Sequence, residues 1–412
     1  MSAPAAELIS DEALPVLPVE APAFWADPEA FLAPARRQHP WLAKFSQGYV
    51  VHGCQANKDL FQDDARLWMG LDGLVAFYGA EGTPWARFMN EMLNSQRGAE
   101  HARIRGSVAA AFTPRRANAM RPVMREVIGG LLDAWAPKGA PGGAFDFAEF
   151  AADFPIAVMC ALLGVPTGPI PRLRKSLEAQ LAAISMNRDA APAFMAGCEI
   201  MGDFADQIVR EREASGVSDP NALLDAMIAA KASGQLDARE LRYLIMVLLF
   251  AGYDTSKNML TMTMHLLLDR PQMYARCAED EAWCAKVVDE ALRRSNIATP
   301  VRQVQTPFVY DGFRFPKGAI VYMATPLAGR DPEAFDDPMR FDPERTDKAR
   351  HVAFGRGPHI CIGQFLARAQ LEEGLHLIAR RLKAPRRNGP VDWRPFLGAW
   401  GLRTLPIAFD AA

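Results

Sequence analysis

Apolar residues recur at helical spacing through most of the chain from Ala56 to about Leu292. Within this region Asp237 and Glu240 stand three residues apart in the order of a capping box, a pattern typical of a helix start. The helical pattern behind them continues to Asp269. It predicts one helix of roughly 33 residues, about 50 Å long, which is enough to cross the whole molecule.

Beyond Pro300 the pattern changes to short runs of β-branched and aromatic residues. The turn sequences Asp311-Gly312 and Lys317-Gly318 separate these runs. The predicted strands are Val301–Val304, Phe308–Tyr310, Phe313–Phe315 and Ala319–Met323, with one hairpin at Lys44–His52 and a last one at Val391–Phe409. We find no internal repeat and no Gly/Ser-rich linker. We therefore predict an extended N-terminal arm (residues 1–23) and a single, mainly α-helical domain with a small β portion (residues 24–412).

The composition narrows the class of protein. With 412 residues, 50% of them hydrophobic, the chain can bury a large core, and its net charge of −2 gives no reason to expect nucleic acid or an anionic membrane as a partner. Acidic residues interrupt positions 1–20, and the most apolar run, Leu244–Tyr253, is too short to span a bilayer. The six cysteines form no C-x-x-C pair, which favours reduced thiols. We expect a cytoplasmic protein without a signal peptide or membrane anchor.

The stretch Phe354–Gly363 (FGRGPHICIG) carries the most specific chemistry in the chain. Cys361 stands between a glycine-rich loop and a predicted helix over 364–381, where backbone N–H groups and the positive helix end would lower the pKa of its thiol. The loop glycines would let the backbone approach a large flat group. A thiolate ligand of haem iron needs these surroundings, whereas an arbitrary Cys-Ile-Gly is more often a buried structural cysteine.

The spacing F-x-x-G-x-x-x-C-x-G resembles the haem-binding loop of the cytochrome P450 family. The resemblance runs from about residue 24 to the C-terminus. It implies the cytochrome P450 fold, a single haem domain shaped like a triangular prism with a long central helix. It also implies haem b as the cofactor, with Cys361 as the iron ligand and with Phe354, Gly355 and Gly363 against the haem.

A second motif consists of Glu290 and Arg293, which stand three apart on one predicted helix face. By itself such a pair is usually a solvated surface ion pair that contributes almost nothing to stability. Its place between the long helix and the cysteine loop resembles the E-x-x-R motif of the P450 family. The resemblance implies a buried network with Arg345 that supports the cysteine loop and does no chemistry.

A third motif, Ala251–Thr255 (AGYDT), lies within the long predicted helix. Gly252 costs about 1 kcal/mol there relative to alanine, and an Asp-Thr pair alone would indicate the exposed face of an amphipathic helix. The run resembles the catalytic acid–alcohol motif of the family. The resemblance implies that Gly252 permits a local widening of the helix, that Thr255 holds the proton needed for O–O cleavage, and that Asp254 relays protons from solvent. Ser256 could supply a second hydroxyl.

Haem carries two propionate groups, and burying them without polar partners would be strongly unfavourable. Four residues lie at positions that resemble the family's propionate ligands. They are His101 and Arg105 on one predicted helix, Arg302 at a strand start, and His359 in the cysteine loop. Each alone would also fit an ordinary surface charge.

The segments that correspond to the family's substrate contacts are rich in large apolar residues. The resemblance assigns to this pocket Trp68, Leu74, Phe77, Trp85, Phe250, Ala298, Leu397 and Trp400. Any one of them would equally fit the hydrophobic core. Together they predict an apolar pocket without a carboxylate clamp, and hence an apolar small molecule as the substrate.

The resemblance implies a soluble monooxygenase of the bacterial type that hydroxylates or epoxidises its substrate with one atom of O₂. Electrons would come from NAD(P)H through a reductase and a ferredoxin, and we expect a monomer. Basic residues are expected around the cysteine loop, where the ferredoxin would dock: Arg103, Arg115, Arg116, Arg350, Arg356 and Arg368.

Three alternatives stay open at this point. A peroxygenase of the family would carry an arginine in place of the acid–alcohol pair, so Asp254 and Thr255 argue against it. A non-catalytic haem sensor or carrier would not need a proton relay. An oxidative coupling or ring-closing enzyme would use the same motifs as a hydroxylase, and the sequence does not distinguish the two or identify the substrate.

Overall fold

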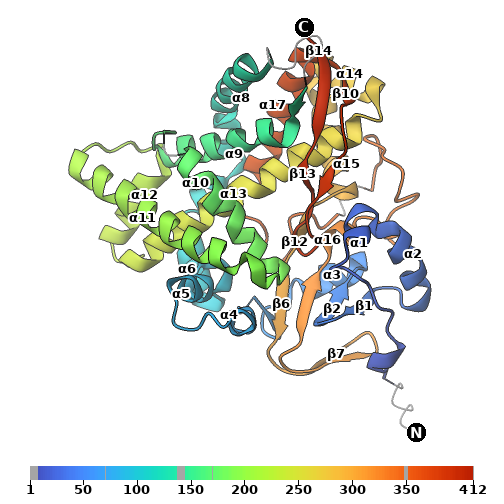
Figure 1. Ribbon diagram of the computed structural model, residues 1–412. Coiled ribbons are helices and arrows are strands. Elements are labelled where there is room, and N and C mark those ends of the chain that lie inside the picture. Colours follow the sequence, from blue (N-terminus) through green and yellow to red (C-terminus); the bar gives the residue numbers. More distant parts are fainter. Residues whose placement is uncertain (1–7, 70, 137–143, 169, 348–350, 412) are drawn as a thin grey trace.

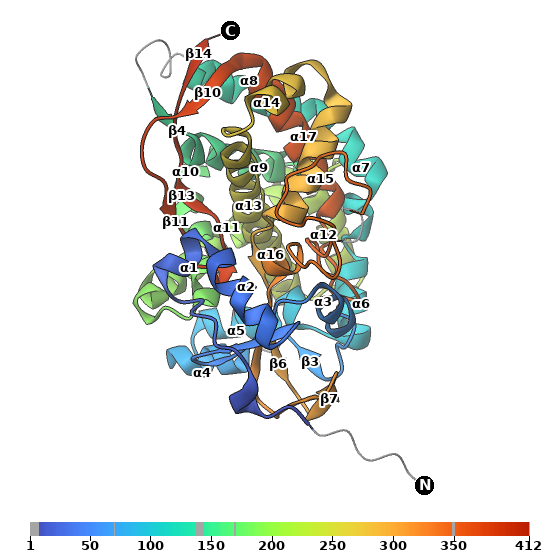
Figure 2. The ribbon, with the colours of Figure 1, turned by 90° about the vertical axis from the view of Figure 1, so that its right-hand side faces the viewer.

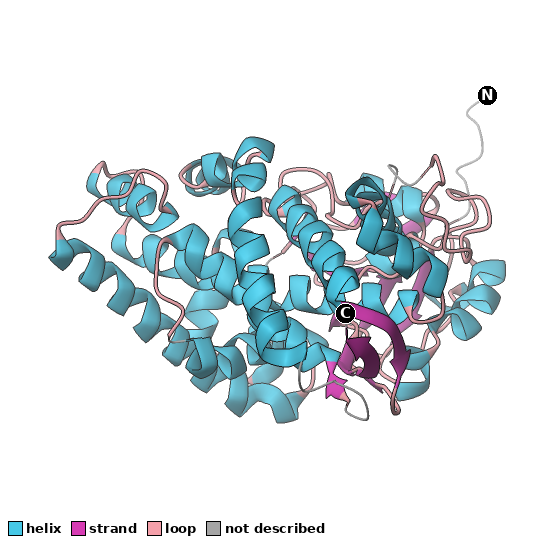
Figure 3. Ribbon diagram, turned by 90° about the horizontal axis from the view of Figure 1, so that it is seen from above, coloured by secondary structure: helices cyan, strands magenta, loops and turns pink. Residues whose placement is uncertain are grey.

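The computed structural model describes residues 8–69, 71–136, 144–168, 170–347 and 351–411. The chain is mainly helical (Figure 1), and Figure 3 shows the strands gathered toward one side of the helical body, which confirms the predicted fold class. The helices are α1 (Pro22–Ala26), α2 (Pro28–Gln38), α3 (Cys54–Leu60), α4 (Asp72–Tyr78), α5 (Pro84–Glu91), α6 (Gly98–Gly106), α7 (Pro114–Ala119), α8 (Arg121–Trp135), α9 (Phe147–Leu163), α10 (Ile170–Ala182), α11 (Ala191–Ser215), α12 (Leu223–Ala232), α13 (Ala238–Leu267), α14 (Pro271–Glu279), α15 (Glu281–Arg294), α16 (Thr325–Ala328) and α17 (Gln364–Arg381). The strands are β1 (Leu42–Phe45), β2 (Gly48–Val51), β3 (Leu67–Trp68), β4 (Phe145–Asp146), β5 (Ala298–Thr299), β6 (Val301–Val304), β7 (Phe308–Tyr310), β8 (Phe313–Phe315), β9 (Ile320–Met323), β10 (Leu382–Arg387), β11 (Asp392–Trp393), β12 (Gly398–Ala399), β13 (Leu402–Thr404) and β14 (Pro406–Ala411).

The central helix is α13, which contacts α9, α10, α11, α15 and α17 (Figure 1). Its N-terminus has the predicted capping box. The Glu240 N–H donates to Asp237 Oδ1 (2.7 Å), and the Asp237 N–H donates to Glu240 Oε2 (2.9 Å). Buried side chains occupy most of the helix surface, as expected for a helix with neighbours on several sides.

Five short strands form the main sheet in the order β1-β2-β9-β6-β3. The strands β1 and β2 form the predicted N-terminal hairpin, β2 runs parallel to β9, and β6 to β9 fall on the four strands predicted beyond Pro300. The single hairpin predicted at the C-terminus is only partly correct. There β11 pairs with β13, whereas β14 lies between β10 and β4 in a separate sheet. The pairing of β14 with β4 could not be predicted, because β4 is far away in the sequence and such a contact produces no pattern in the residues around β14.

One hydrophobic core includes buried side chains from Leu17 to Phe409, and a smaller cluster is built around the main sheet. The described part of the predicted arm packs along this sheet. Leu14 and Leu17 are buried there, and Val16 forms a parallel bridge with Lys44. The division of the chain at residue 23 stays a prediction. Among the described helices, none has the length and apolar character needed to cross a membrane.

The cysteine loop leads directly into α17, and α17 packs against α7, α13 and α15. Figure 2 shows α7, α15 and α17 on the same side of α13. This packing brings the start of α17, with Cys361, close to the face of α13 that carries Thr255.

Candidate active site

Two glycines fold the cysteine loop back on itself. Gly355 and Gly357 have φ angles of +69° and +72°, which residues with a side chain rarely adopt. A Cβ at Gly357 would also lie 2.6 Å from the carbonyl oxygen of Phe61. The Cys361 N–H donates to the Phe354 carbonyl across the turn (2.9 Å). The loop therefore holds Cys361 in a fixed place at the start of α17.

Cys361 faces an internal cavity and is exposed to it, whereas the other five cysteines, all of them in the described part of the chain, are buried. Burial in the protein raises the pKa of the Cys361 thiol, while the Gly363 N–H and the Arg105 guanidinium lower it. The predicted direction of this pKa shift is therefore wrong. The loss of water around the sulfur outweighs the N–H donor and the nearby positive charge.

The cavity brings together residues from distant parts of the chain. The predicted site residues that line it are His101, Arg105, Ala251, Thr255, Ala298, Arg302, Phe354, Gly355, His359 and Cys361. Several further residues line the cavity that the sequence motifs did not predict, among them Leu93, Asn94, Met259, Leu292, Asn296 and Leu371. Each of these is one residue on an otherwise ordinary face, so no periodicity marks it. Cys361 and Thr255 thus face one space from two different elements.

Arg302 and Arg105 are the best candidates to bind an anionic group in this cavity. Arg302 is buried, burial lowers its pKa to about 10, and its side chain donates to the Val301 carbonyl (2.8 Å). Arg105 donates to the Ile360 carbonyl (2.7 Å), and neither arginine has an acidic partner among the described residues. Arg302 is buried and Arg105 is half-buried, and guanidinium groups withdrawn from water without an anion are unfavourable, so these two residues fit the propionate groups of haem.

His101 and His359 lie side by side at the same cavity, with their ring centroids 4.2 Å apart. Burial, together with Arg302 and His101, lowers the pKa of His359 to about 4. Burial also lowers the pKa of His101. Both rings are therefore neutral at pH 7, and each has a single N–H group to donate. The Asp64 carboxylate accepts the N–H of His359, so His101 is the ring of this pair with an N–H left for a propionate. Asp64, 2.9 Å from His359 Nε2, is a partner that no sequence motif indicated.

On α13, Ala251 and Thr255 line the cavity, and so does Ser256. The Thr255 hydroxyl donates to the Ala251 carbonyl one turn earlier (2.6 Å). Gly252 lies outside the lining. A Cβ at this position would lie 2.8 Å from Met159 Sδ on α9, so the glycine allows α9 and α13 to pack closely. The helix is regular from 238 to 267, so the local widening predicted at Gly252 is not present.

Asp254 is fully buried and does not line the cavity. Its Oδ1 accepts a hydrogen bond from Arg394 Nη1 (2.8 Å). Its Oδ2 lies 2.8 Å from Arg394 Nη2, in an ion pair without hydrogen-bond geometry. Arg394 follows β11, 140 positions further along the chain, and nothing in the local sequence marks it as a partner. The acid and the alcohol of the AGYDT motif therefore have different surroundings.

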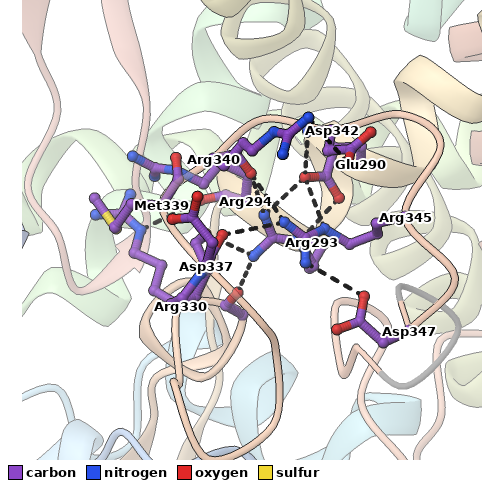
Figure 4. A network of polar contacts seen from close by, with 12 residues as sticks. Glu290, Arg293, Arg294, Arg330, Asp337, Met339, Arg340, Asp342, Arg345 and Asp347 are labelled. Atoms are coloured by element: carbon purple, nitrogen blue, oxygen red, sulfur yellow. Dashed lines mark hydrogen bonds and ion pairs between the residues drawn. The ribbon is translucent and has the colours of Figure 1, made fainter.

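The network of Glu290, Arg293 and Arg345 is present (Figure 4). Glu290 accepts hydrogen bonds from Arg293 Nε (2.8 Å) and Nη2 (2.7 Å) and from Arg345 Nε (3.2 Å). Glu290 and Arg293 are fully buried. Arg293 also donates to the carbonyls of Pro338 and Arg340, which ties α15 to the loop before the cysteine loop. None of the three lines the cavity, so their geometry fits a structural role.

Asp289, the neighbour of Glu290 on α15, connects this helix to α17. It accepts a hydrogen bond from Arg368 and lies 3.2 Å from His351 Nε2. Burial raises the pKa of Asp289, but the contacts with His351 and Arg368 bring it down to about 2. The carboxylate is therefore charged at neutral pH and holds the start of α17 against α15.

Most of the predicted substrate residues lie outside the cavity, and of that group Ala298 is in the lining. Trp85 is buried in an aromatic cluster with Tyr78 and Phe194. Trp400 stacks on Trp393. Trp68, Leu74, Phe77 and Phe250 are likewise absent from the lining, and Leu397 lines a second cavity. These side chains lie outside the lining of this cavity, since large apolar residues suit the core as well as a pocket, and their role as substrate contacts stays a prediction.

Comparisons with known proteins point to one family. The family model for cytochrome P450 matches residues 182–282 and 284–391. Luteothin monooxygenase from Streptomyces thioluteus is 35% identical, over 97% of this chain and 97% of that protein. The structure of the cytochrome P450 enzyme CxnD for C–S bond formation in chuangxinmycin biosynthesis has a TM-score of 0.85 at 26% identity, covering 97% of this chain and 98% of that one. Epothilone B-bound cytochrome P450epoK has the same fold, with a TM-score of 0.86 at 24% identity over 96% of this chain and 99% of that one.

Proposed function

This chain belongs to the cytochrome P450 family, and we propose that it is a haem-thiolate monooxygenase in which Cys361 binds the iron of haem b. Members of this family use haem and O₂. The observation that carries the proposal is that Cys361 and Thr255 line one cavity together with buried Arg302 and half-buried Arg105, which have no acidic partner among the described residues. We take residues 24–412 as a single haem domain.

The bound haem would supply the activation of O₂ and the transfer of one oxygen atom to the substrate. Cys361 would hold the iron through its sulfur, and the Gly363 N–H would limit the basicity of that sulfur. Arg105 and Arg302 would bind the propionates through charge-assisted hydrogen bonds, and His101 through its N–H group. His359, whose N–H donates to Asp64, would stand beside them at the same wall. Phe354 and Gly355 line the same cavity and would pack against the ring.

On the other wall, Thr255 would hold and pass on the proton that O–O cleavage requires. Its hydroxyl donates to the Ala251 carbonyl, so rotation about χ1 would free it to act within the cavity. Asp254 would supply the proton from the solvent side. The apolar residues around Thr255, such as Val247, Leu248 and Ile297, would exclude bulk water from the reaction.

The cavity favours an apolar substrate. Among the residues described in its lining there is no aspartate or glutamate that could bind a cationic group. Hydroxylation or epoxidation of a small molecule is therefore the reaction that this geometry supports best. Oxidative bond formation is the second candidate, because CxnD, 26% identical to this chain, is named for C–S bond formation.

Isotope labelling distinguishes these two reactions. In an atmosphere of ¹⁸O₂, a hydroxylase or epoxidase should place one labelled atom in the product, as measured by mass spectrometry. A coupling or ring-closing reaction should give an unlabelled product whose mass is lower by two hydrogens.

The proposed iron ligand is tested by the spectrum of the reduced protein with carbon monoxide. The wild-type protein should show the red-shifted Soret band of a thiolate complex, and Cys361→His should lose this band even if haem is retained. Cys160→Ser, which changes a buried cysteine outside the cavity lining, should keep it. A wild-type band in Cys361→His would rule out Cys361 as the ligand.

For electron delivery from NAD(P)H we propose a reductase and an acidic ferredoxin that docks beside the cysteine loop. Of the predicted basic residues, Arg115 and Arg356 are exposed and make no hydrogen bond or ion pair within the described structure. Arg103 is paired with Glu240, Arg116 donates to the Asn221 carbonyl, and Arg368 is paired with Asp289. Arg350 lies outside the described residues. Arg116 keeps its positive charge because its partner is a neutral carbonyl, so the uncompensated charge among these described residues lies at Arg115, Arg116 and Arg356.

A further inference from the structure

A surface cavity of about 370 Å³ lies between α2 and the loop that follows α16. Glu29, Arg36 and Arg37 line it from one face of α2, and Arg330 lines it from the loop. None of these four residues lines the cavity of Cys361. Most of the lining side chains are charged, so this space suits a polar ligand and not an apolar substrate.

Arg330 is a buried cation whose hydrogen bond and ring contact are both with neutral groups. It is 4% exposed. Its Nε donates to the Arg294 carbonyl (3.2 Å), and its guanidinium lies over the Trp400 ring, 5.2 Å from the centroid. Within the described structure it forms no ion pair. A buried guanidinium without an anion is strongly unfavourable, so the remaining N–H groups of Arg330 are suited to bind an anion from the cavity.

Two more arginines add positive charge around Arg330. Arg36 donates to the carbonyls of Arg330 (2.6 Å) and Leu327 (2.8 Å). Arg294, which Figure 4 shows together with Arg330, donates to the Met339 carbonyl (3.2 Å). Burial lowers the pKa of all three arginines, and that of Arg294 to about 10. Neutral carbonyls do not compensate a positive charge, so three guanidinium groups without an ion pair in the described structure lie at or beside this cavity.

The Glu29 carboxylate lines the same cavity and has no hydrogen-bond donor among the described residues. It is half-buried, and its Oε2 is enclosed by protein. Its negative charge opposes the lowering that burial causes in the pKa of the three arginines, which places it near all of them. It nevertheless forms no ion pair with any described residue. Glu29 is therefore a free acceptor beside free donors, and a ligand that bridges the two must carry both an acceptor and a donor.

The other two acidic side chains of the lining are already accounted for. Asp331 is buried, and its two oxygens accept hydrogen bonds from the N–H groups of Cys54 (2.6 Å) and Glu333 (3.0 Å). Glu333 itself is exposed and solvated. The groups with unused hydrogen-bonding capacity toward the cavity are thus Arg330 and Glu29.

We propose that this cavity binds an oxyanion that keeps a proton at neutral pH, namely hydrogen phosphate or bicarbonate. The charged oxygens of the ion would accept hydrogen bonds from Arg330, and from Arg37 at the exposed entrance, while its O–H group would donate to Glu29. A carboxylate can only accept, so it repels an oxyanion that has no proton. The site should therefore bind hydrogen phosphate and reject sulfate. The proposal does not depend on the oxygenation chemistry at Cys361.

The first test is calorimetric titration of the haem-bound protein with sodium phosphate, bicarbonate and sulfate, at neutral pH and constant ionic strength. One phosphate should bind per chain, and sulfate should bind at least about tenfold more weakly, because it lacks the hydrogen bond to a charged acceptor. Tighter binding of bicarbonate than of phosphate would support the same chemistry and identify bicarbonate as the ligand. Equal affinity for phosphate and sulfate, or no binding of phosphate and bicarbonate, would overturn the proposal.

The second test uses Glu29→Gln, which keeps the size of the side chain, removes its negative charge and adds an N–H donor. The preference for phosphate over sulfate should fall from at least about tenfold to less than about twofold, mainly because sulfate binds more tightly. Haem content and unfolding temperature should stay unchanged, since Glu29 makes no hydrogen bond in the described structure. An unchanged preference in this variant would show that Glu29 does not contact the ion and would overturn the proposal.

Glu126→Gln is the matched control, because it makes the same change at an exposed position of α8 outside the cavity lining. It should leave both affinities as they are in the wild type. A crystal structure of the wild-type protein with phosphate should then show the ion between Arg330 and Glu29. Phosphate bound only at another place would overturn the proposal.

Discussion

The two walls of the candidate haem cavity are built in opposite ways. On the thiolate side, the cysteine loop is closed by the hydrogen bond from Cys361 to Phe354, and Glu290 behind it has charged donors on both oxygens. On the acid side, formed by α13 and Arg394, Asp254 depends on one distant arginine, and the described structure gives Asn258 no partner. The cysteine loop and Glu290 are held by several hydrogen bonds, whereas Asp254 and Asn258 have hydrogen-bonding capacity that the described structure leaves unused.

This difference fits what each wall has to do. An iron ligand must stay in one place, because small displacements of a reacting group are costly, and a closed network of buried hydrogen bonds provides that rigidity. A proton donor must change partners in each cycle, so a saturated network would hold it in one state. The thiolate side should therefore respond to mutation mainly in stability, and the acid side mainly in the yield of product.

The largest effect is expected from Glu290→Ala on the thiolate side. It leaves Arg293 buried without a counter-ion, and breaking a buried pair in this way should lower the free energy of unfolding by roughly 3–5 kcal/mol. Chemical denaturation of the haem-bound protein measures this change. Loss of haem should accompany it, because the network holds the loops around Cys361.

Asp133→Ala is the matched control for an ion pair outside the network. Asp133 pairs with Arg381, and its side chain is 70% exposed, so removing it should cost less than about 1 kcal/mol. Equal losses in the two variants would mean that the Glu290 network does not make the thiolate side more rigid than an ordinary surface.

The thiolate side could be predicted from the sequence, and the acid side only in part. The loop Phe354–Gly363 is a continuous run whose glycines and cysteine act on one another locally, so its pattern is visible in the chain. The partner of Asp254, Arg394, follows a short strand 140 positions away, and such long-range pairing leaves no periodic signal. Trp85 was predicted to line the substrate pocket, but it is buried in an aromatic cluster. The sequence could not show this, because hydrophobicity alone does not distinguish a residue of a cavity wall from a residue of the core.

On the acid side, Thr255→Ala should change the stability of the protein less than Glu290→Ala does. It should mainly lower the amount of product formed per NAD(P)H. Haem content and substrate binding should stay nearly unchanged, since within the described structure the Thr255 hydroxyl donates its hydrogen bond to the Ala251 carbonyl of its own helix. NAD(P)H should still be consumed, but product per NAD(P)H should fall by at least about tenfold, with release of hydrogen peroxide, because a positioned proton donor contributes roughly 10²–10⁴-fold.

Ser256 lines the same cavity, and its hydroxyl could replace that of Thr255 and restore part of the product yield in this variant. The double variant Thr255→Ala/Ser256→Ala removes it. Full yield of product in the double variant would contradict the assignment of Asp254 and Thr255 as the acid–alcohol pair. It would also contradict the proposed difference in role between the two walls.

The smallest effect is expected on the outer surface of the thiolate side, where Arg356 is exposed and unpaired. Arg356→Glu should slow reduction by an acidic ferredoxin about three- to tenfold at low salt and leave substrate binding unchanged, because charge steers the encounter and does not alter the cavity. Stopped-flow reduction measures the rate. The difference between the variant and the wild type should vanish near 1 M salt, because the Debye length is about 10 Å at about 0.1 M salt and only about 3 Å at about 1 M.

Arg314→Glu, which makes the same change in net charge at an exposed position of β8, is the control for this prediction. It should leave the reduction rate within about twofold of the wild type, because Arg314 is not one of the basic residues predicted around the cysteine loop and exposed charges act mainly at short range. Equal slowing in Arg314→Glu and Arg356→Glu would show that only the total charge matters. Unchanged rates in both variants would place the ferredoxin on another face, and the rigidity of the thiolate side would then serve the iron ligand alone.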